Sequence, residues 1–373
     1  MKRIAIAAAM FGLFAIEAHA DAVSQTPSVD IYGRLEAGGM YQNRTTTGGS
    51  NLGFVDGQME STIFGLKGSR SMPDGMSAGF TLEGGVSTGN GQNANSTGAS
   101  SDIFGREANV TLGGPWGTIG AGMQMDPALI ASVGTEPRQL TNSFSLLSQW
   151  VDATIFNGAG AGASGSLQGG IFDQNAFSYT YAKNGLYVGI EHALGGVSGS
   201  ASANTSSSIG LSYTRSGFTG SFSYALANSR TPGVGRQSQI VTLGGAYAAP
   251  AYAVRAQIGE FQSGFAGGVA AHDVRTWGIG LDIKTLPSQV LNLAYYSASD
   301  KGAAFGGSGS ELALMDTYDL FKDTQVYGQI AAVRADANAG YAAAYGGIYT
   351  AENGLTSAAG TTTFIGAGVR YSF

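Results

Sequence analysis

The feature that most constrains this 373-residue chain is a regular alternation of short and long links between segments in which apolar and polar residues alternate. Sixteen segments show this period of two, which is typical of β-strands because successive side chains of a strand point to opposite faces. The expected strands are 30–41, 60–70, 76–87, 103–113, 117–124, 175–182, 186–193, 207–215, 218–226, 238–247, 252–261, 274–284, 289–298, 311–319, 324–333 and 362–373.

The links between these segments alternate in length along the whole chain. The short ones are rich in Gly, Pro, Asn and Asp, as tight hairpins are, and they are 71–75, 114–116, 183–185, 216–217, 248–251, 285–288 and 320–323. The long, polar ones are 42–59, 89–102, 125–174, 194–206, 227–237, 262–273, 299–310 and 334–361. A Greek-key sandwich gives no reason for this alternation, whereas a transmembrane barrel has short turns at one rim and long loops at the other.

The sequence therefore predicts an all-β fold, a 16-stranded antiparallel transmembrane β-barrel with short periplasmic turns and long external loops. Lipid offers no hydrogen-bond partner to an open sheet edge, so the first strand is expected to pair with the sixteenth. Side chains cannot fill a barrel of this width, and the interior is expected to hold a water-filled channel.

The N-terminus has the pattern of a secretory signal peptide. Lys2 and Arg3 precede thirteen uncharged residues, and Ala18-His19-Ala20 precedes Asp21. The apolar run is shorter than the roughly 20 residues that a spanning helix needs. We expect residues 1–20 to be cleaved and residues 21–373 to form the barrel domain.

Composition agrees with an exported barrel and argues against several other classes of protein. The chain has 60 Gly, 17 Tyr, 18 Phe, no Cys and only 12% charged residues. Without Lys2, Arg3 and Glu17, the 19 basic and 25 acidic residues become 17 and 24, a net charge of −7 that argues against a nucleic-acid partner. His192 and His272 have no convincing Ser or Asp arrangement beside them, so we expect surface histidines, no catalytic residue, no metal and no cofactor.

The last segment, Phe364–Phe373, ends on an aromatic residue, with Tyr371 two positions before Phe373. This ending resembles the closing strand of Gram-negative outer-membrane proteins. Further segments strengthen the likeness: SVDIYGRLEAG after the signal, FGLKGS at 64–69, FTLEGG at 80–85, FGREANVTLGGPWGTIGAGMQ at 104–124, YDLFKDTQVYGQ at 318–329 and GVRYSF at 368–373. As an ordered set they resemble the general-diffusion porins, the trimeric sixteen-stranded outer-membrane family of the beta-proteobacterial type.

The resemblance implies a homotrimer in outer-membrane lipid and lipopolysaccharide that passes ions and small hydrophilic solutes by passive diffusion. It also implies that Tyr371 and Phe373 form the insertion signal for the barrel-assembly machinery. The chain departs from the family at the pore, because Ile63 stands where an Arg is common, Glu107 follows Arg106, and the approach to the third loop reads Gly122-Met123-Gln124. These departures put a strongly cationic constriction in doubt.

Parity along the strands places acids and bases together on the lumen face, where they would create a field across the channel. The charged residues placed there are Asp30, Arg34, Glu36, Lys67, Glu83, Glu107, Glu191, Arg255, Asp282, Lys284 and Arg370. The candidate pore-lining and constriction residues are Arg34, Glu36, Lys67, Glu83, Arg106, Glu107, Asp126, Glu136, Arg138, Asp152 and Arg370. For each of them the alternative is a charge that is solvated or paired against the wall.

The longest loop, 125–174, is expected from the resemblance to fold inward, anchored by Phe144, Leu146, Leu147, Trp150 and Ile155; the alternative is a solvated external loop. Its acids Asp126, Glu136, Asp152 and Asp173 outnumber its single base, Arg138, by three. A Debye length of about 10 Å at ~0.1 M salt lets such charges act across a pore. The sequence thus predicts weak cation preference, against the family's frequent anion preference.

Two alternatives to a general channel stay open. A substrate-specific sugar channel would line its path with aromatic side chains, and Tyr32, Tyr187, Tyr296 and Tyr327 face the lumen by parity, although on separated strands. An exported adhesin or structural barrel would conduct no ions at all.

Overall fold

The computed structural model describes residues 27–45, 49–94, 102–146, 171–264, 269–270, 272–302, 307–335 and 360–373. The predicted signal peptide, Asp152 and the expected anchors Leu147, Trp150 and Ile155 lie outside this part of the chain. Within it, no helix is both long and apolar enough to cross a membrane.

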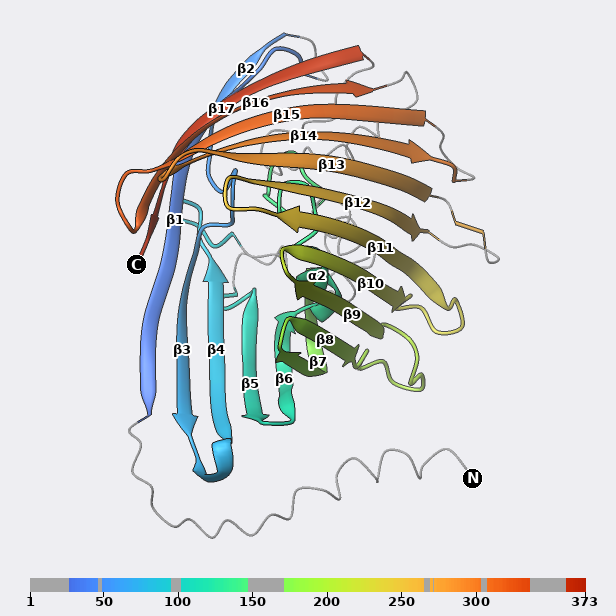
Figure 1. The fold of residues 1–373 in the computed structure, drawn as a ribbon. Coiled ribbons are helices and arrows are strands. Elements are labelled where there is room, and N and C mark those ends of the chain that lie inside the picture. Colours follow the sequence, from blue (N-terminus) through green and yellow to red (C-terminus); the bar gives the residue numbers. More distant parts are fainter. Residues whose placement is uncertain are drawn as a thin grey trace.

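The described residues form one closed antiparallel sheet (Figure 1). Its strands are β1 (Ser28–Gln42), β2 (Asn51–Val55), β3 (Ile63–Ser71), β4 (Ser77–Gly85), β5 (Glu107–Gly114), β6 (Gly117–Met125), β7 (Phe172–Lys183), β8 (Leu186–Ala193), β9 (Ser206–Arg215), β10 (Phe218–Asn228), β11 (Arg236–Ala248), β12 (Tyr252–Ser263), β13 (His272–Leu286), β14 (Gln289–Asp300), β15 (Gly307–Asp319), β16 (Thr324–Ala335) and β17 (Gly360–Ser372). A 3₁₀ turn, η1 (Pro73–Gly75), and one short helix, α2 (Pro127–Ser132), complete the described elements.

The barrel closes through β1, as the sequence predicts. Residues Arg34–Gln42 of β1 pair with residues 364–372 of β17. The other edge of β1 pairs first with β3, from Ser28 to Arg34, and then with β2, from Gly38 to Gln42. Because β2 and β3 together act as one member of the sheet, the seventeen described strands form a 16-stranded barrel, which confirms the predicted fold class.

The break between β2 and β3 is where the strand prediction is wrong. The sequence assigns residues 42–59 to a loop and starts a strand at Glu60, whereas residues 51–55 pair with β1 and β3 begins at Ile63. The physical reason is the carboxylate of Glu36, which accepts hydrogen bonds from the backbone N–H groups of Met59 (2.9 Å) and Glu60 (3.2 Å). These bonds replace ladder bonds and draw residues 56–62 out of the wall.

The two faces of the strands differ as their period of two predicts. Ile31 and Leu35 of β1 are exposed on the outside, while Glu36 and Gln42 of the same strand are buried inside. Tight turns join the hairpins, for example at Asn184 and Gly185, whose positive φ values of 54° and 83° suit the turns that join twisted strands. An apolar outer face and a polar inner face are the arrangement of a barrel in lipid.

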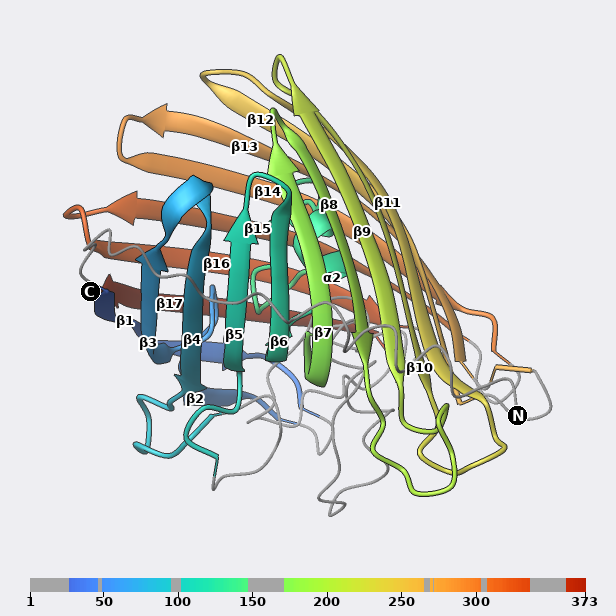
Figure 2. The same cartoon turned by 90° about the horizontal axis from the view of Figure 1, so that it is seen from below.

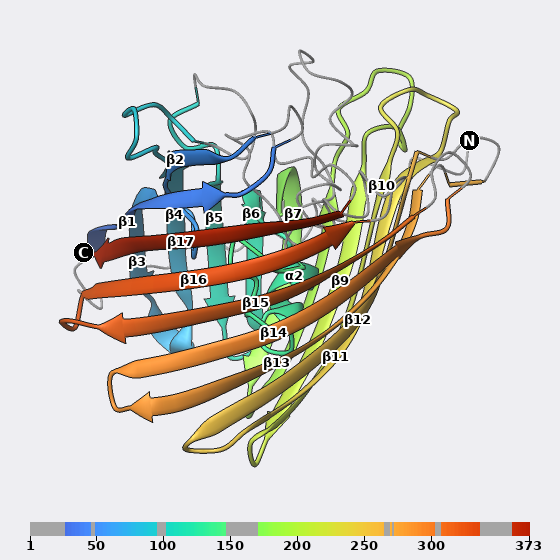
Figure 3. The ribbon, with the colours of Figure 1, turned by 90° about the horizontal axis from the view of Figure 1, so that it is seen from above.

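The described part of the longest loop, residues 126–146, lies inside the barrel, which confirms inward folding for this part. Figures 2 and 3 view the barrel from opposite sides, and both show α2 within the ring of strands. Ala128 and Leu129 of α2 are buried against Ile240, Phe261 and Val274 of the wall. Farther along, Phe144 is 1% exposed and packs on Phe364 with ring centroids 5.4 Å apart, and Leu146 is also buried, as expected of anchors.

Glycines of the wall provide the space in which this loop lies. A Cβ added at Gly210, Gly244 or Gly280 would lie closer than 3.0 Å to Pro127, Thr135 or Pro137 of the loop, respectively. Wall side chains then hold the loop by hydrogen bonds: Asn292 donates to the Pro137 carbonyl at 3.2 Å and Gln257 donates to the Ser132 carbonyl at 3.2 Å. Part of the high glycine content is thus explained by close approach of the loop to the wall.

Candidate functional site

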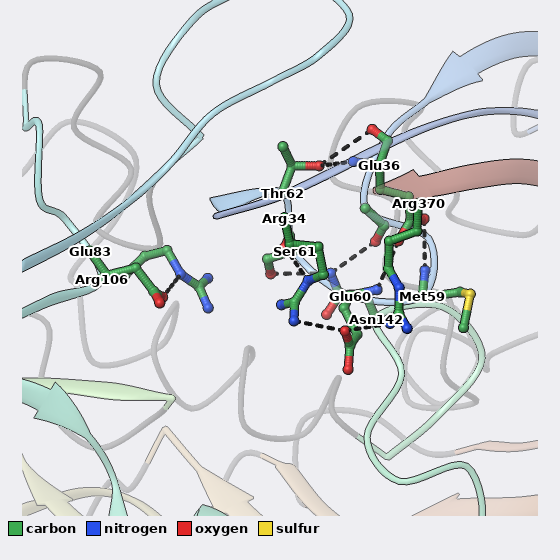
Figure 4. Close-up of polar contacts among 11 residues, drawn as sticks. Arg34, Glu36, Met59, Glu60, Ser61, Thr62, Glu83, Arg106, Asn142 and Arg370 are labelled. Carbon is green, nitrogen blue, oxygen red and sulfur yellow. Dashed lines mark hydrogen bonds and ion pairs between the residues drawn. The ribbon is translucent and has the colours of Figure 1, made fainter. Parts of the chain in front are cut away.

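The candidate site is a set of opposed charges inside the barrel, drawn from β1, β17, residues 56–62 and the segment before β5 (Figure 4). Glu36 of β1 lies directly across from Arg370 of β17 in the strand register. Arg34 stands two positions before Glu36 and therefore shares its face of the strand. Because Glu36 draws residues 56–62 out of the wall, Glu60 lies beside Arg34 and Arg370.

Glu60 joins the two arginines. Its Oε2 lies 2.8 Å from Nη1 of Arg34 and 2.6 Å from Nη1 of Arg370. The Glu60 side chain is 43% exposed, compared with 25% for Arg34 and 22% for Arg370. Arg34 also donates from Nε to the Ser61 carbonyl at 3.2 Å. The carboxylate is therefore the most water-accessible group of this cluster, and two guanidinium groups hold it in position.

A second charged pair joins Glu83 of β4 to Arg106 of the segment before β5. Nε of Arg106 donates to Oε1 of Glu83 at 2.7 Å, and the hydroxyl of Tyr32 donates to Oε2 of the same carboxylate at 3.0 Å. The Arg106 guanidinium also lies over the Phe172 ring, 4.7 Å from its centroid. Charge-assisted bonds and stacking of this kind fix a guanidinium in one orientation.

Glu36 is a buried structural residue and does not line the water-filled space. Its side chain is 1% exposed and accepts from Met59 N, Glu60 N and, at 2.7 Å, the hydroxyl of Tyr327. Lys67 lies 5.2 Å from the centroid of the Tyr32 ring and, with Asp30, lines a small polar cavity. Glu107 is half-buried and accepts from the side-chain amide of Asn109 at 3.2 Å.

The third-loop charges do not lie where the sequence-based hypothesis needs them. Asp126, Glu136 and Arg138 are 0%, 0% and 3% exposed, so they do not face water as constriction charges would. Glu136 accepts from the backbone N–H groups of Arg138 and Leu140 and from the Tyr296 hydroxyl, and Arg138 donates to Gln329 at 3.1 Å. Placement of these residues in a water-facing constriction is therefore wrong, because the wall's polar groups bind them as anchors.

Asp126 caps α2 by accepting from the Ala128 N–H at 2.7 Å. Complete burial, together with the negative charge of the neighbouring Asp173, raises the pKa of the Asp126 carboxyl to about 8. Burial away from water disfavours the charged form of a carboxyl group, so ionisation of Asp126 without a nearby positive charge costs free energy.

Two further expectations are corrected or extended. His272 is 7% exposed and its Nδ1 lies 2.9 Å from Oδ2 of Asp300, so the prediction of a surface histidine is wrong there, while His192 is exposed and contacts Ser207.

Sequence reasoning missed Glu60, because parity was applied to a strand that begins only at Ile63. It also missed Glu311, which is 1% exposed on the inner face and which the parity of Ala313 and Met315 would have identified.

A 16-stranded barrel with an internal loop and opposed charges on its inner wall defines a channel-forming outer-membrane protein. Comparison with known proteins agrees: the family described as Gram-negative porin matches residues 5–338, and the chain belongs to this family. Membership of a porin family places the protein in the outer membrane, as a channel rather than an enzyme.

The relatives define how far the likeness extends. An outer membrane porin protein of Bordetella pertussis is 30% identical over 142 residues, an alignment that spans 34% of this chain and 34% of that relative. An anion-selective porin from Comamonas acidovorans superposes with a TM-score of 0.74 at 20% identity, covering 93% of this chain and all of that one. An in-vitro folded outer membrane protein of Vibrio cholerae in trimer form gives 0.63 at 11% identity, covering 94% and 100%. At such identities the structures share the fold alone.

Proposed function

We propose that the barrel is a passive diffusion channel for ions and small hydrophilic solutes. The observation that carries this is the charged group of Arg34, Glu60 and Arg370, which faces the Arg106–Glu83 pair inside the barrel. Opposed charges across a water path orient polar solutes and slow apolar ones, without a binding pocket for any one of them.

A substrate-specific channel is the second candidate, and the tyrosines argue against it. Each hydroxyl that would form an aromatic sugar path is committed to an internal partner: Tyr32 to Glu83, Tyr187 to the Pro127 carbonyl, Tyr296 to Glu136 and Tyr327 to Glu36. These rings anchor the loop and the charged residues, and Tyr296 and Tyr327 are buried. The family membership favours a conducting barrel over the adhesin.

Swelling of liposomes that contain the purified protein tests this choice. For a general channel we expect swelling rates that fall smoothly with the size of uncharged sugars and that do not saturate with concentration. Saturable uptake of one sugar, or block of ion current by it, would support the specific channel instead.

For ion preference we propose weak selectivity for cations. Glu36 of Figure 4 is buried and does not contribute, so the remaining charged residues drawn there are three arginines (Arg34, Arg106 and Arg370) and two glutamates (Glu60 and Glu83). The buried loop acids no longer supply the argument; the support is that Glu60 is more exposed than either arginine that binds it. A reversal potential in a potassium chloride gradient tests this, and chloride preference would refute it.

We further propose a homotrimer embedded in outer-membrane lipid and lipopolysaccharide, inserted by the barrel-assembly machinery through Tyr371 and Phe373. The Vibrio cholerae barrel in trimer form supports this assembly by analogy. Tyr371 and Phe373 are both exposed, with ring centroids 6.2 Å apart, and the Phe373 backbone pairs with Gly33 of β1. The last residue is therefore both an accessible aromatic group and part of the closing seam.

A further inference from the structure

Three carboxylates that are far apart in the sequence lie close together in space, at the point where the third loop leaves the wall. Asp126 stands at the start of the loop, Asp173 follows the return of the chain into β7, and Glu191 lies on β8. One oxygen from each lies within 4.8 Å of the others, and all three residues are buried. Their meeting is a product of the antiparallel topology, which places β6, β7 and β8 side by side.

Two of the three carboxylates have no basic partner among the described residues: neither Asp126 nor Glu191 forms an ion pair with a described Lys or Arg. Carboxylates brought together without a cation repel one another and lose solvation, so such a cluster needs a bound cation or shared protons.

A buried carboxylate of the cluster lacks a hydrogen-bond donor, which is the independent sign of a missing ligand. Both oxygens of Glu191, a residue 5% exposed, receive no hydrogen bond from a described hydroxyl, amide or basic group, and the side chain that they contact is the carboxyl of Asp173. Ser208 lies opposite Glu191 in the register of β8 and β9, and its hydroxyl faces Asp126. Native structures rarely leave such groups unsatisfied.

From this geometry we propose that Asp126, Asp173 and Glu191 bind one divalent cation of the Ca²⁺ type, with Ser208 Oγ as an additional neutral oxygen. Ca²⁺ takes oxygen ligands at about 2.3–2.6 Å, so two oxygens that share one ion stand at most about 5 Å apart, in agreement with the spacing of these carboxylates. Mg²⁺ demands stricter octahedral geometry and keeps several waters, which suits this dry cluster less well.

Such an ion would join the start of the third loop to the wall. Asp126 already fixes the first turn of α2 through its other oxygen, which accepts from Ala128 N. A cation shared with Asp173 and Glu191 connects this turn to β7 and β8, and its binding therefore stabilises the folded-in position of the loop.

The test is calcium chloride titration of the purified full-length protein, stripped with EDTA, by calorimetry, with Asp126→Asn and Glu191→Gln as variants. Asn is also a good helix N-cap, so the first of these removes the charge while keeping the bond to Ala128. Glu311→Gln is the matched control, because Glu311 is another buried wall carboxylate, outside the cluster, whose oxygens have no described partner. Circular dichroism checks that every variant retains the barrel.

We expect one saturable Ca²⁺ site per chain in the wild type and in Glu311→Gln, and affinity at least about tenfold lower in the two cluster variants, because ligand charge sets Ca²⁺ affinity over several orders of magnitude. Ca²⁺ should also raise the heat-dissociation temperature of the wild type but not of the cluster variants. Absence of saturable binding to the wild type at millimolar Ca²⁺ would overturn the proposal and assign the cluster to shared protons. Equal binding by all the variants, or tighter binding of Mg²⁺ than of Ca²⁺, would contradict it as well.

Discussion

The close contact between the third loop and a glycine of the wall allows a sharp test of how the loop is held. In Gly280→Ala the new Cβ would lie 2.9 Å from both Cα and the carbonyl carbon of Pro137, and closer still to its oxygen. Ordinary contact begins at 3.4 Å, so the loop backbone must retreat from the wall by about half an ångström at these two carbons and by more at the oxygen. Because these atoms of Pro137 belong to the backbone, no side-chain rotation can relieve the overlap.

The expected cost of this overpacking is about 1–3 kcal/mol, borne by the contacts between the loop and the wall. The retreat also lengthens the 3.2 Å hydrogen bond from Asn292 to the Pro137 carbonyl. Since the loop lies inside the barrel, its only direction of retreat is toward the barrel axis. We therefore expect lower single-channel conductance in planar bilayers, more frequent partial closures, and a lower temperature of heat dissociation in gels.

Gly220→Ala and Gly328→Ala are the matched controls, because a Cβ at either position would meet nothing within 4 Å. Neither glycine has a positive φ, so alanine introduces no backbone strain there. If Gly280→Ala has the same conductance and heat stability as the controls, the close contact between the loop and Gly280 does not hold the loop in place.

Three further predictions concern assembly, insertion and selectivity. The protein should migrate as a large band in unheated SDS gels and as a monomer after boiling; a monomer-sized band insensitive to heat would count against the trimer. Deletion of Phe373 should leave the chain in the periplasm to be degraded, whereas deletion of a few residues within the long link expected from the sequence at 334–361 should not, and normal outer-membrane yield of the Phe373 deletion would contradict the role of this residue. Glu60→Gln removes the exposed carboxylate between Arg34 and Arg370 and should shift the reversal potential toward chloride, while Arg34→Gln should shift it toward potassium; an unchanged potential in both would show that selectivity is set elsewhere.

Much of the fold could be predicted from the sequence because its determinants are local. Alternation in β1, for example, depends only on lipid outside and polar groups inside, and turns such as Asn184-Gly185 need the positive φ that these residues tolerate. The closing pair of β1 and β17 follows from the need to remove sheet edges. The predicted strand ends were less accurate, most clearly around β2. The chain leaves the wall after β2 because its backbone donates hydrogen bonds to Glu36, a residue more than twenty positions earlier in the sequence.

The site was predictable only in part, because burial within the lumen is a tertiary property. Parity assigns Arg34, Glu83 and Arg370 to one face, and in the structure each of them forms an ion pair with another charged residue of the site. It could not show that Glu136 and Arg138 would be bound by wall residues such as Tyr296 and Gln329, more than 150 positions away in the sequence. Nor could it bring Asp126 next to Glu191, since that contact exists only once the loop has returned to the wall.

The central claim is that this barrel is an open, water-filled channel, and the current through the purified wild-type protein in a planar bilayer under a salt gradient tests it most directly. We expect stepwise current increases on insertion, a linear current–voltage relation near zero voltage, conductance that rises in proportion to the conductivity of the bulk salt solution, and a small reversal potential of the sign that favours potassium. Insertion without any current would contradict the claim, and so would a conductance that saturates at low salt.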